Sequence, residues 1–327
     1  MLSIKRNKIL YFPIFVFLIF AITNIDILFS INAAQITDRF NYQDNITNGD
    51  FLYTLAINAG FPLILFTEPL FKSIYYSFFI LNIDPQFAIK LIIFIMITAT
   101  FYILNKKTNI SPFWIILIVL SPTVIVNYVM TIRQGFATVL FLIVLYYING
   151  NLKNIFLSII PLFHYSFFIV LPIYFFSIKK NRNSNPYKII ILVIIYSALI
   201  SILILKLTSL LNLSYFENYI DDSKFKFGFG LVFWFFILIL FMSEGKQFLQ
   251  KNLFETLCVA FYVGSVSFFN PFSRILQAVS IIILISGFSL TGWRKQTFKL
   301  MLFLFVLYLL IPILYNYNLG SMMLNTD

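Results

Sequence analysis

Two arginines stand where long apolar stretches begin, and both have the chemistry to hold an anion. Arg133, followed directly by Gln134, opens one such stretch, and Arg274 opens a later one. The amino end of a helix has unpaired N–H groups and the positive end of the helix dipole, which favour an anion. A guanidinium also binds phosphate through two parallel hydrogen bonds. We therefore expect Arg133, Arg274 and Gln134 to bind a phosphate group, although arginines at helix ends also suit lipid headgroups.

His164 is the only histidine in the chain and follows Pro161 in an otherwise apolar segment. Its neighbours Tyr165 and Ser166 are polar as well. A neutral imidazole can orient a hydroxyl group or take its proton near neutral pH. The pattern therefore favours a catalytic His164, with Tyr165 at the substrate, over a histidine that only packs.

Two acidic positions complete the set of reactive candidates. The segment from Asp38 to Asp44 is the most polar in the chain and includes Arg39 and Tyr42. Aromatic rings stack on sugar faces and carboxylates accept hydrogen bonds from sugar hydroxyls, so this segment suits either a sugar or a solvated loop. Glu68 lies between apolar runs and needs a partner such as an arginine. Asp38 and Glu68 are alternative proton acceptors, and Glu68 fits structural pairing equally well.

Several kinds of chemistry have no motif in this sequence. We find no glycine-rich phosphate loop, no Cys/His spacing for a metal and no heme-type histidine pair. We therefore expect neither a metal nor another cofactor. The net charge of +11 could suit nucleic acid, but the basic residues gather in short joints between apolar runs, which argues against that partner.

The composition places these residues in a membrane. Of 327 residues, 61% are hydrophobic and only 11% charged, against about 25% charged in soluble domains. Long apolar runs recur along the whole chain, which predicts an all-α polytopic membrane protein with a single transmembrane domain over residues 1–327. The expected spans are Ile9–Phe29, Gln86–Leu104, Pro112–Met130, Gly135–Ile148, Lys188–Thr208, Gly228–Met242, Leu253–Phe269, Arg274–Leu290 and Lys299–Tyr315.

The charges orient these spans. With the amino terminus in the cytosol, 15 of the 23 basic residues fall in cytosolic joints, as the positive-inside rule requires. The carboxyl terminus is then external. In this frame Arg133, Arg274 and the segments 30–85 and 209–227 are all external, so we expect the two segments to be loops that cap a site on that face.

Two segments do not fit as simple spans. Ile155–Phe176 lies between basic groups that both favour the cytosol, which predicts two half-helices meeting near Pro161–His164; one ordinary helix is the alternative. Broken helices occur at membrane depth where they line protein or water. Phe51–Leu81 is either an external interfacial helix or a short in-and-out pair. We expect nine full spans, with ten or eleven as the alternatives.

The order of these groups resembles the Wzy/EpsG-type family of bacterial polysaccharide polymerases. The resemblance covers residues 38–290 and rests on five short motifs. These are Asp38 with Tyr42, Glu68-Pro69-Leu70-Phe71, Arg133-Gln134-Gly135-Phe136-Ala137, Phe163-His164-Tyr165-Ser166, and Arg274 before a late span.

Membership would imply a metal-independent glycosyltransferase with a GT-C-like helical fold in the bacterial inner membrane. Such enzymes polymerise oligosaccharide repeat units carried on undecaprenyl pyrophosphate at the external face, and the resemblance suggests a chain-length regulator as a partner. An O-antigen ligase, a flippase for the same lipid-linked sugar and a membrane O-acyltransferase are the alternatives. The repeat-unit sugars do not follow from the sequence.

Overall fold

The computed structural model describes residues 15–17, 19–24, 37–58, 60–61, 64, 67–180, 185–210, 229–268 and 272–314. Every regular element in these ranges is helical, and the chain is an all-α polytopic membrane protein. The helices fall into two units. The first runs to Phe168 and includes the chain from Val306, and the second is formed by Ile169–Phe305.

Two described helices are long and apolar enough to cross a membrane alone, α6 (Pro85–Lys107) and α12 (Pro186–Leu210, over Pro186–Ile204). A third span results if the bent pair Pro112–Val119 and Pro122–Met130 acts as one. The other apolar helices that qualify by composition have 10–17 residues. Most predicted spans therefore correspond to helices that begin and end within a few residues of the predicted bounds, while their number stays a prediction.

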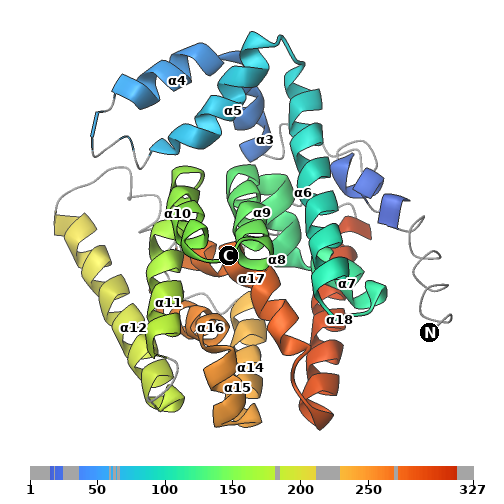
Figure 1. Ribbon diagram of the computed structural model, residues 1–327, viewed down its shortest axis with the longest axis vertical. Coiled ribbons are helices and arrows are strands. Elements are labelled where there is room, and N and C mark those ends of the chain that lie inside the picture. Colours follow the sequence, from blue (N-terminus) through green and yellow to red (C-terminus); the bar gives the residue numbers. More distant parts are fainter. Residues whose placement is uncertain are drawn as a thin grey trace. The chain divides into compact units, whose positions relative to one another are not determined.

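Three helices in the first unit occupy most of the region predicted to be an external loop. They are α3 (Thr37–Thr47), α4 (Gly49–Asn58) and α5 (Pro69–Ile80), and Figure 1 shows them together at one end of α6. Tyr53 of α4 stacks on Tyr76 of α5 with 4.7 Å between ring centroids. Segment 51–81 thus forms parts of two packed helices. The predicted loop 209–227 lies outside the described residues from 211 onward.

Helix α6 is bounded by groups that match its dipole. The Asp84 carboxylate accepts a hydrogen bond from the Phe87 N–H at 2.8 Å, and Pro85 occupies the first turn, where no N–H is needed. Lys106 and Lys107 lie in the last turn, beside the negative end of the dipole. These groups stabilise both ends of α6, which is the longest helix that lies wholly within the first unit.

The predicted span Pro112–Met130 is not straight. Helix α7 (Pro112–Val119) ends before Pro122, and the chain continues at 59° as α8 (Pro122–Ile125) and a π-helical turn, η3 (Val126–Met130). Pro122 has no N–H for the preceding turn, and its ring disfavours a helical Ser121, which explains the break. Helix α9 (Ile132–Tyr147) follows η3 directly. A side chain at Gly135 would clash with the Asn127 carbonyl oxygen and the Tyr128 ring, so glycine allows α9 to pack on η3.

The predicted break near Pro161–His164 is present. Helix α10 (Asn151–Ile159) tightens into a 3₁₀ turn, η4 (Ile160–Leu162), and α11 (Phe167–Lys180) begins only after four non-helical residues. His164, Tyr165 and Ser166 lie in this break. Whether the two halves form a re-entrant pair stays a prediction.

In the second unit, α12 packs along α16 (Leu253–Ser265), which also contacts α14 (Phe229–Glu244) and α17 (Ser273–Gly287). The α12–α16 contact is close because Gly264 faces Ser197 and the Ile194 carbonyl oxygen, where a Cβ would collide. The short α15 (Lys246–Lys251) joins α14 to α16, and α18 (Gly292–Leu314) follows α17.

Candidate functional site

Glu68 adopts a backbone conformation that is unfavourable for its residue type. Its φ of 57° and ψ of 54° are left-handed, and a non-glycine residue incurs about 1–2 kcal/mol there. Glu68 immediately precedes α5, yet its side chain does not cap that helix. Strained residues persist where the surroundings fix them, commonly at functional sites. The contacts that the Glu68 carboxylate makes in place of a helix cap must therefore offset this strain.

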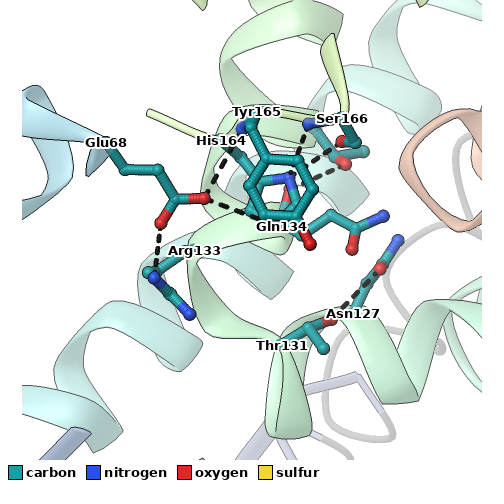
Figure 2. Close-up of polar contacts among 9 residues, drawn as sticks. Glu68, Asn127, Thr131, Arg133, Gln134, His164, Tyr165 and Ser166 are labelled. Carbon is teal, nitrogen blue, oxygen red and sulfur yellow. Dashed lines mark hydrogen bonds and ion pairs between the residues drawn. The ribbon is translucent and has the colours of Figure 1, made fainter. Parts of the chain in front are cut away.

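The Glu68 carboxylate contacts side chains and backbone from two distant parts of the chain (Figure 2). Its Oε2 lies 2.5 Å from a terminal guanidinium nitrogen of Arg133, forming an ion pair. Its Oε1 accepts a hydrogen bond from the Tyr165 N–H at 3.4 Å and lies 3.7 Å from His164 Nε2. One buried carboxylate thus joins α5, α9 and the break between η4 and α11.

The break supplies these contacts because the backbone N–H groups of Tyr165 and Ser166 donate to side chains instead of to helix carbonyls. Tyr165 N–H donates to Glu68, while Ser166 N–H donates to His164 Nδ1 at 3.3 Å. The Ser166 hydroxyl lies 2.8 Å from the same ring nitrogen. Tyr165 stacks on the His164 ring with 4.6 Å between centroids. The imidazole is therefore fixed on one edge by Ser166 and on one face by Tyr165.

Arg133 is partly exposed, unlike the two buried residues Glu68 and His164. Its side chain is 35% exposed, whereas Glu68 is 2% and His164 3% exposed. Its guanidinium carbon lies 5.7 Å from the centroid of the buried Tyr42 ring of α3, within the range of a cation–π contact. Glu68 and Tyr42 hold Arg133 from two sides while part of its side chain stays accessible.

Aromatic side chains line the region around the ion pair. The buried Phe71 ring lies 5.7 Å from Phe136, and Phe136 lies 5.6 Å from Phe163. Apolar surroundings strengthen attraction between opposite charges and penalise an isolated charge. Burial accordingly raises the pKa of Glu68 above its usual value, although Arg133 and the Tyr165 N–H oppose that shift.

Lys72 adds a second positive charge to the cluster. It lies one turn after Glu68 on α5, and its pKa is lowered by burial and then by repulsion from Arg133, with Glu68 acting in the opposite direction. Lys72 was not predicted as a site residue. Its spacing of four residues from Glu68 on a helix was the available signal.

The structure brings most of the predicted site residues of the first unit together. Glu68, Arg133, His164, Tyr165 and Tyr42 form one connected cluster. Gln134 lies beside Arg133 but is fully buried, facing the interior near Asn127 and Thr131 (Figure 2). Thr131 and Asn127 share a 3.3 Å side-chain hydrogen bond, and neither was predicted.

The remaining predicted residues lie elsewhere. Asp38 and Arg39 belong to α3, and their side chains are outside the described part of the structure. Arg274 lies in the first turn of α17, as expected, within the second unit. Its pairing with Arg133 stays a prediction. Among the described residues, no three His, Cys, Asp or Glu side chains gather as metal ligands would.

Comparison with known proteins gives one result. The model of the EpsG family matches residues 10–323, nearly the whole chain. No match was found among curated proteins or solved structures. The predicted GT-C-like fold therefore stays a prediction.

Proposed function

Since the chain belongs to the EpsG family, which suggests a polysaccharide polymerase-like membrane protein, we propose that it links oligosaccharide repeat units carried on undecaprenyl pyrophosphate. The observation that carries this proposal is the state of Arg133. A buried carboxylate fixes the arginine in place, yet 35% of its side chain remains exposed. A guanidinium that is held in place on a partly exposed side chain is suited to a phosphate oxyanion.

The reaction needs a leaving-group site and a proton acceptor. A hydroxyl oxygen of one repeat unit forms a bond to the anomeric carbon of another, and the bond from that carbon to the pyrophosphate oxygen breaks. The electron pair leaves with the pyrophosphate, where Arg133 stabilises the charge. The hydroxyl proton passes to the pair formed by Glu68 and His164. The incoming pyrophosphate shares Arg133 with Glu68 and weakens the ion pair, which allows Glu68 to accept the proton.

Other predicted residues have supporting roles in this proposal. Tyr165 is 38% exposed beside His164, so its ring is available to a sugar face. Lys72 adds positive charge close to Arg133. Arg274 supplies a second cation for the pyrophosphate, and Asp38 and Arg39 contact sugar hydroxyls. A chain-length regulator is the proposed protein partner.

The direct test uses purified protein and synthetic undecaprenyl-pyrophosphate repeat units, without added metal or nucleotide. We expect a ladder of lipid-linked oligomers on a gel. If no ladder forms, a single transfer product on an added acceptor lipid would indicate a ligase, and translocation without new bonds in sealed proteoliposomes would indicate a flippase. Either result would overturn the polymerase proposal.

The proposal also requires Arg133 to face outward from the cytoplasmic membrane. A cysteine at the exposed Asn41 should react with a membrane-impermeant reagent in intact cells, on a Cys258→Ser background. A cysteine at the exposed Gln296, between the basic residues Lys295 and Lys299, should react only after lysis. The reverse labelling pattern would invert the predicted topology and place the site on the wrong face.

A further inference from the structure

The His164 ring contacts Glu68 on one side and Ser166 on the other, and the two sides determine which nitrogen holds the proton. A neutral imidazole has one N–H donor and one acceptor nitrogen. The Ser166 backbone N–H can only donate, and it donates to Nδ1. Nδ1 must therefore present its lone pair, and the ring proton resides on Nε2.

The Ser166 hydroxyl reinforces this assignment. Its oxygen lies 2.8 Å from Nδ1, so with Nδ1 as the acceptor the hydroxyl donates to it. Two donors from one residue converge on one nitrogen. His164 and Ser166 are both 3% exposed, so water does not readily replace either contact.

The opposite edge of the ring faces the carboxylate. Nε2 lies 3.7 Å from Glu68 Oε1, longer than a hydrogen bond but close enough to form one after a small rotation of either side chain. Catalytic hydrogen bonds are often this long before substrate binds. With its proton on Nε2, His164 directs an N–H at the same oxygen that accepts from the Tyr165 N–H.

We propose that Ser166 is a positioning residue that holds the His164 proton on Nε2, so that His164 donates to Glu68 and Glu68 is the proton acceptor of the pair. The catalytic part of this inference rests on the proposed function, whereas the tautomer does not. Ser166 is not a nucleophile in this arrangement, because its buried hydroxyl is directed at the ring rather than at a substrate.

The single histidine makes the tautomer directly measurable. Protein grown with ¹⁵N-labelled histidine shows one imidazole in an NMR spectrum, and the shifts of its two nitrogens distinguish a protonated from an unprotonated site. We expect Nε2 to be protonated and Nδ1 to be unprotonated at neutral pH in the wild-type protein. A protonated Nδ1 with a bare Nε2 would overturn the inference, whatever the protein's activity.

Two variants test the role of the hydroxyl. Ser166→Ala removes the hydroxyl, the closer of the two donors to Nδ1, and leaves only the backbone N–H at 3.3 Å, so Nε2 should remain the main protonated site while the second tautomer appears as a minor species. Turnover of the lipid-linked substrate should fall about 5- to 10-fold, the worth of one hydrogen bond, at nearly unchanged KM. Ser166→Thr keeps the hydroxyl and should restore both the spectrum and the turnover.

The two parts of the inference fail separately. Equal turnover of Ser166→Ala and wild type, with an unchanged spectrum, would remove Ser166 from the positioning role. A protein with the expected tautomer but no polymerising activity would instead refute the proposed function and leave the tautomer assignment standing.

Discussion

Each unit of the chain contains one Glu–Arg pair among the described residues, and the two carboxylates differ in the other groups that they contact. In the second unit Glu244, in the last turn of α14, accepts hydrogen bonds from the Thr291 N–H at 3.2 Å and the Thr291 hydroxyl at 2.5 Å, just before α18. Arg294 lies 3.7 Å from the other oxygen of Glu244. This carboxylate satisfies the free end of a neighbouring helix.

Glu68 leaves the end of its own helix uncapped. Its backbone is strained, its ion pair is shorter, and its second oxygen faces a histidine held in one orientation. The same two residue types therefore serve different purposes. The Glu244 carboxylate stabilises the end of one helix. Glu68 instead adopts a strained backbone conformation and contacts Arg133 and Tyr165, which lie 65 and 97 residues away in the sequence. We expect substitutions in the Glu68–Arg133 pair to reduce activity more than stability, and substitutions around Glu244 to reduce stability more than activity.

The largest effect should come from the arginines. Arg133→Ala should abolish polymer formation while the protein still inserts and accumulates, because the leaving pyrophosphate loses its fixed cation. Arg133→Lys should restore little, since an ammonium on a flexible stem does not reproduce the planar fork. Glycan ladders from cells and immunoblots of the membranes measure the two properties.

Arg294→Ala and Arg294→Lys are the matched controls and should give normal ladders. If Arg133→Lys also gives a normal ladder, Arg133 contributes only charge, and the difference between the two pairs disappears.

The next effect concerns the carboxylates. Glu68→Gln should lower turnover by about 10²–10⁴-fold, the usual worth of a positioned proton acceptor. Glu244→Gln should leave turnover unchanged. Because burial raises the pKa of Glu68, activity should fall as the pH decreases through a range above that of an exposed carboxyl group, as Glu68 becomes protonated. Single-turnover rates against pH measure both effects.

Asp38→Asn belongs in the same experiment, since Asp38 is the other predicted acceptor. Loss of turnover in Asp38→Asn, together with full turnover in Glu68→Gln, would identify Asp38 as the proton acceptor. Glu68 would then only hold Arg133 in place.

A smaller effect should separate the roles of the histidine. His164→Gln keeps an N–H donor of similar reach and should retain turnover within a few-fold of wild type. His164→Ala removes the donor to Glu68 and should lower turnover about tenfold, as expected for one hydrogen bond to a charged group. Equal losses in the two variants would make His164 itself the proton acceptor.

The smallest effect is one of stability alone. Thr291→Ala removes the hydroxyl that donates to Glu244 and should destabilise the protein by about 1 kcal/mol, with unchanged polymer formation. The control is Ser158→Ala. The Ser158 hydroxyl donates to the Asn154 carbonyl oxygen of its own helix, so its loss should change the melting temperature less. A loss of polymer in Thr291→Ala would show that the second pair also serves the reaction.

The sequence predicted the helices better than the contacts among them. Apolar runs placed α6 and α12, and conflicting charges around Ile155–Phe176 correctly indicated the break at His164. The bend before Pro122 was not predicted, although the Ser121-Pro122 dipeptide is a signal for it. An apolar run indicates that a segment is buried in lipid or protein without indicating that it is straight.

The composition of the site was largely predictable, but its arrangement was not. Glu68 needed a cationic partner, and the sequence offered two arginines at helix ends, Arg133 and Arg274. Only the folded chain selects Arg133, because the contact depends on how α5 packs near α9. The role of Ser166 was also beyond the sequence, since it depends on the orientation of one ring edge.

The π-helical turn before α9 has a consequence for rotational phase. At the end of η3 (Val126–Met130), the Thr131 N–H donates to the Val126 carbonyl oxygen. This hydrogen bond reaches five residues back along the chain, instead of the four of an α-helix. A π-helical turn takes in one additional residue while the chain on either side keeps its phase. Deleting one residue there would let the turn close four residues back, as in an ordinary helix, and would leave Arg133 directed at Glu68. Natural chains of this kind that differ by one residue in this turn are thus expected to keep the ion pair and the activity.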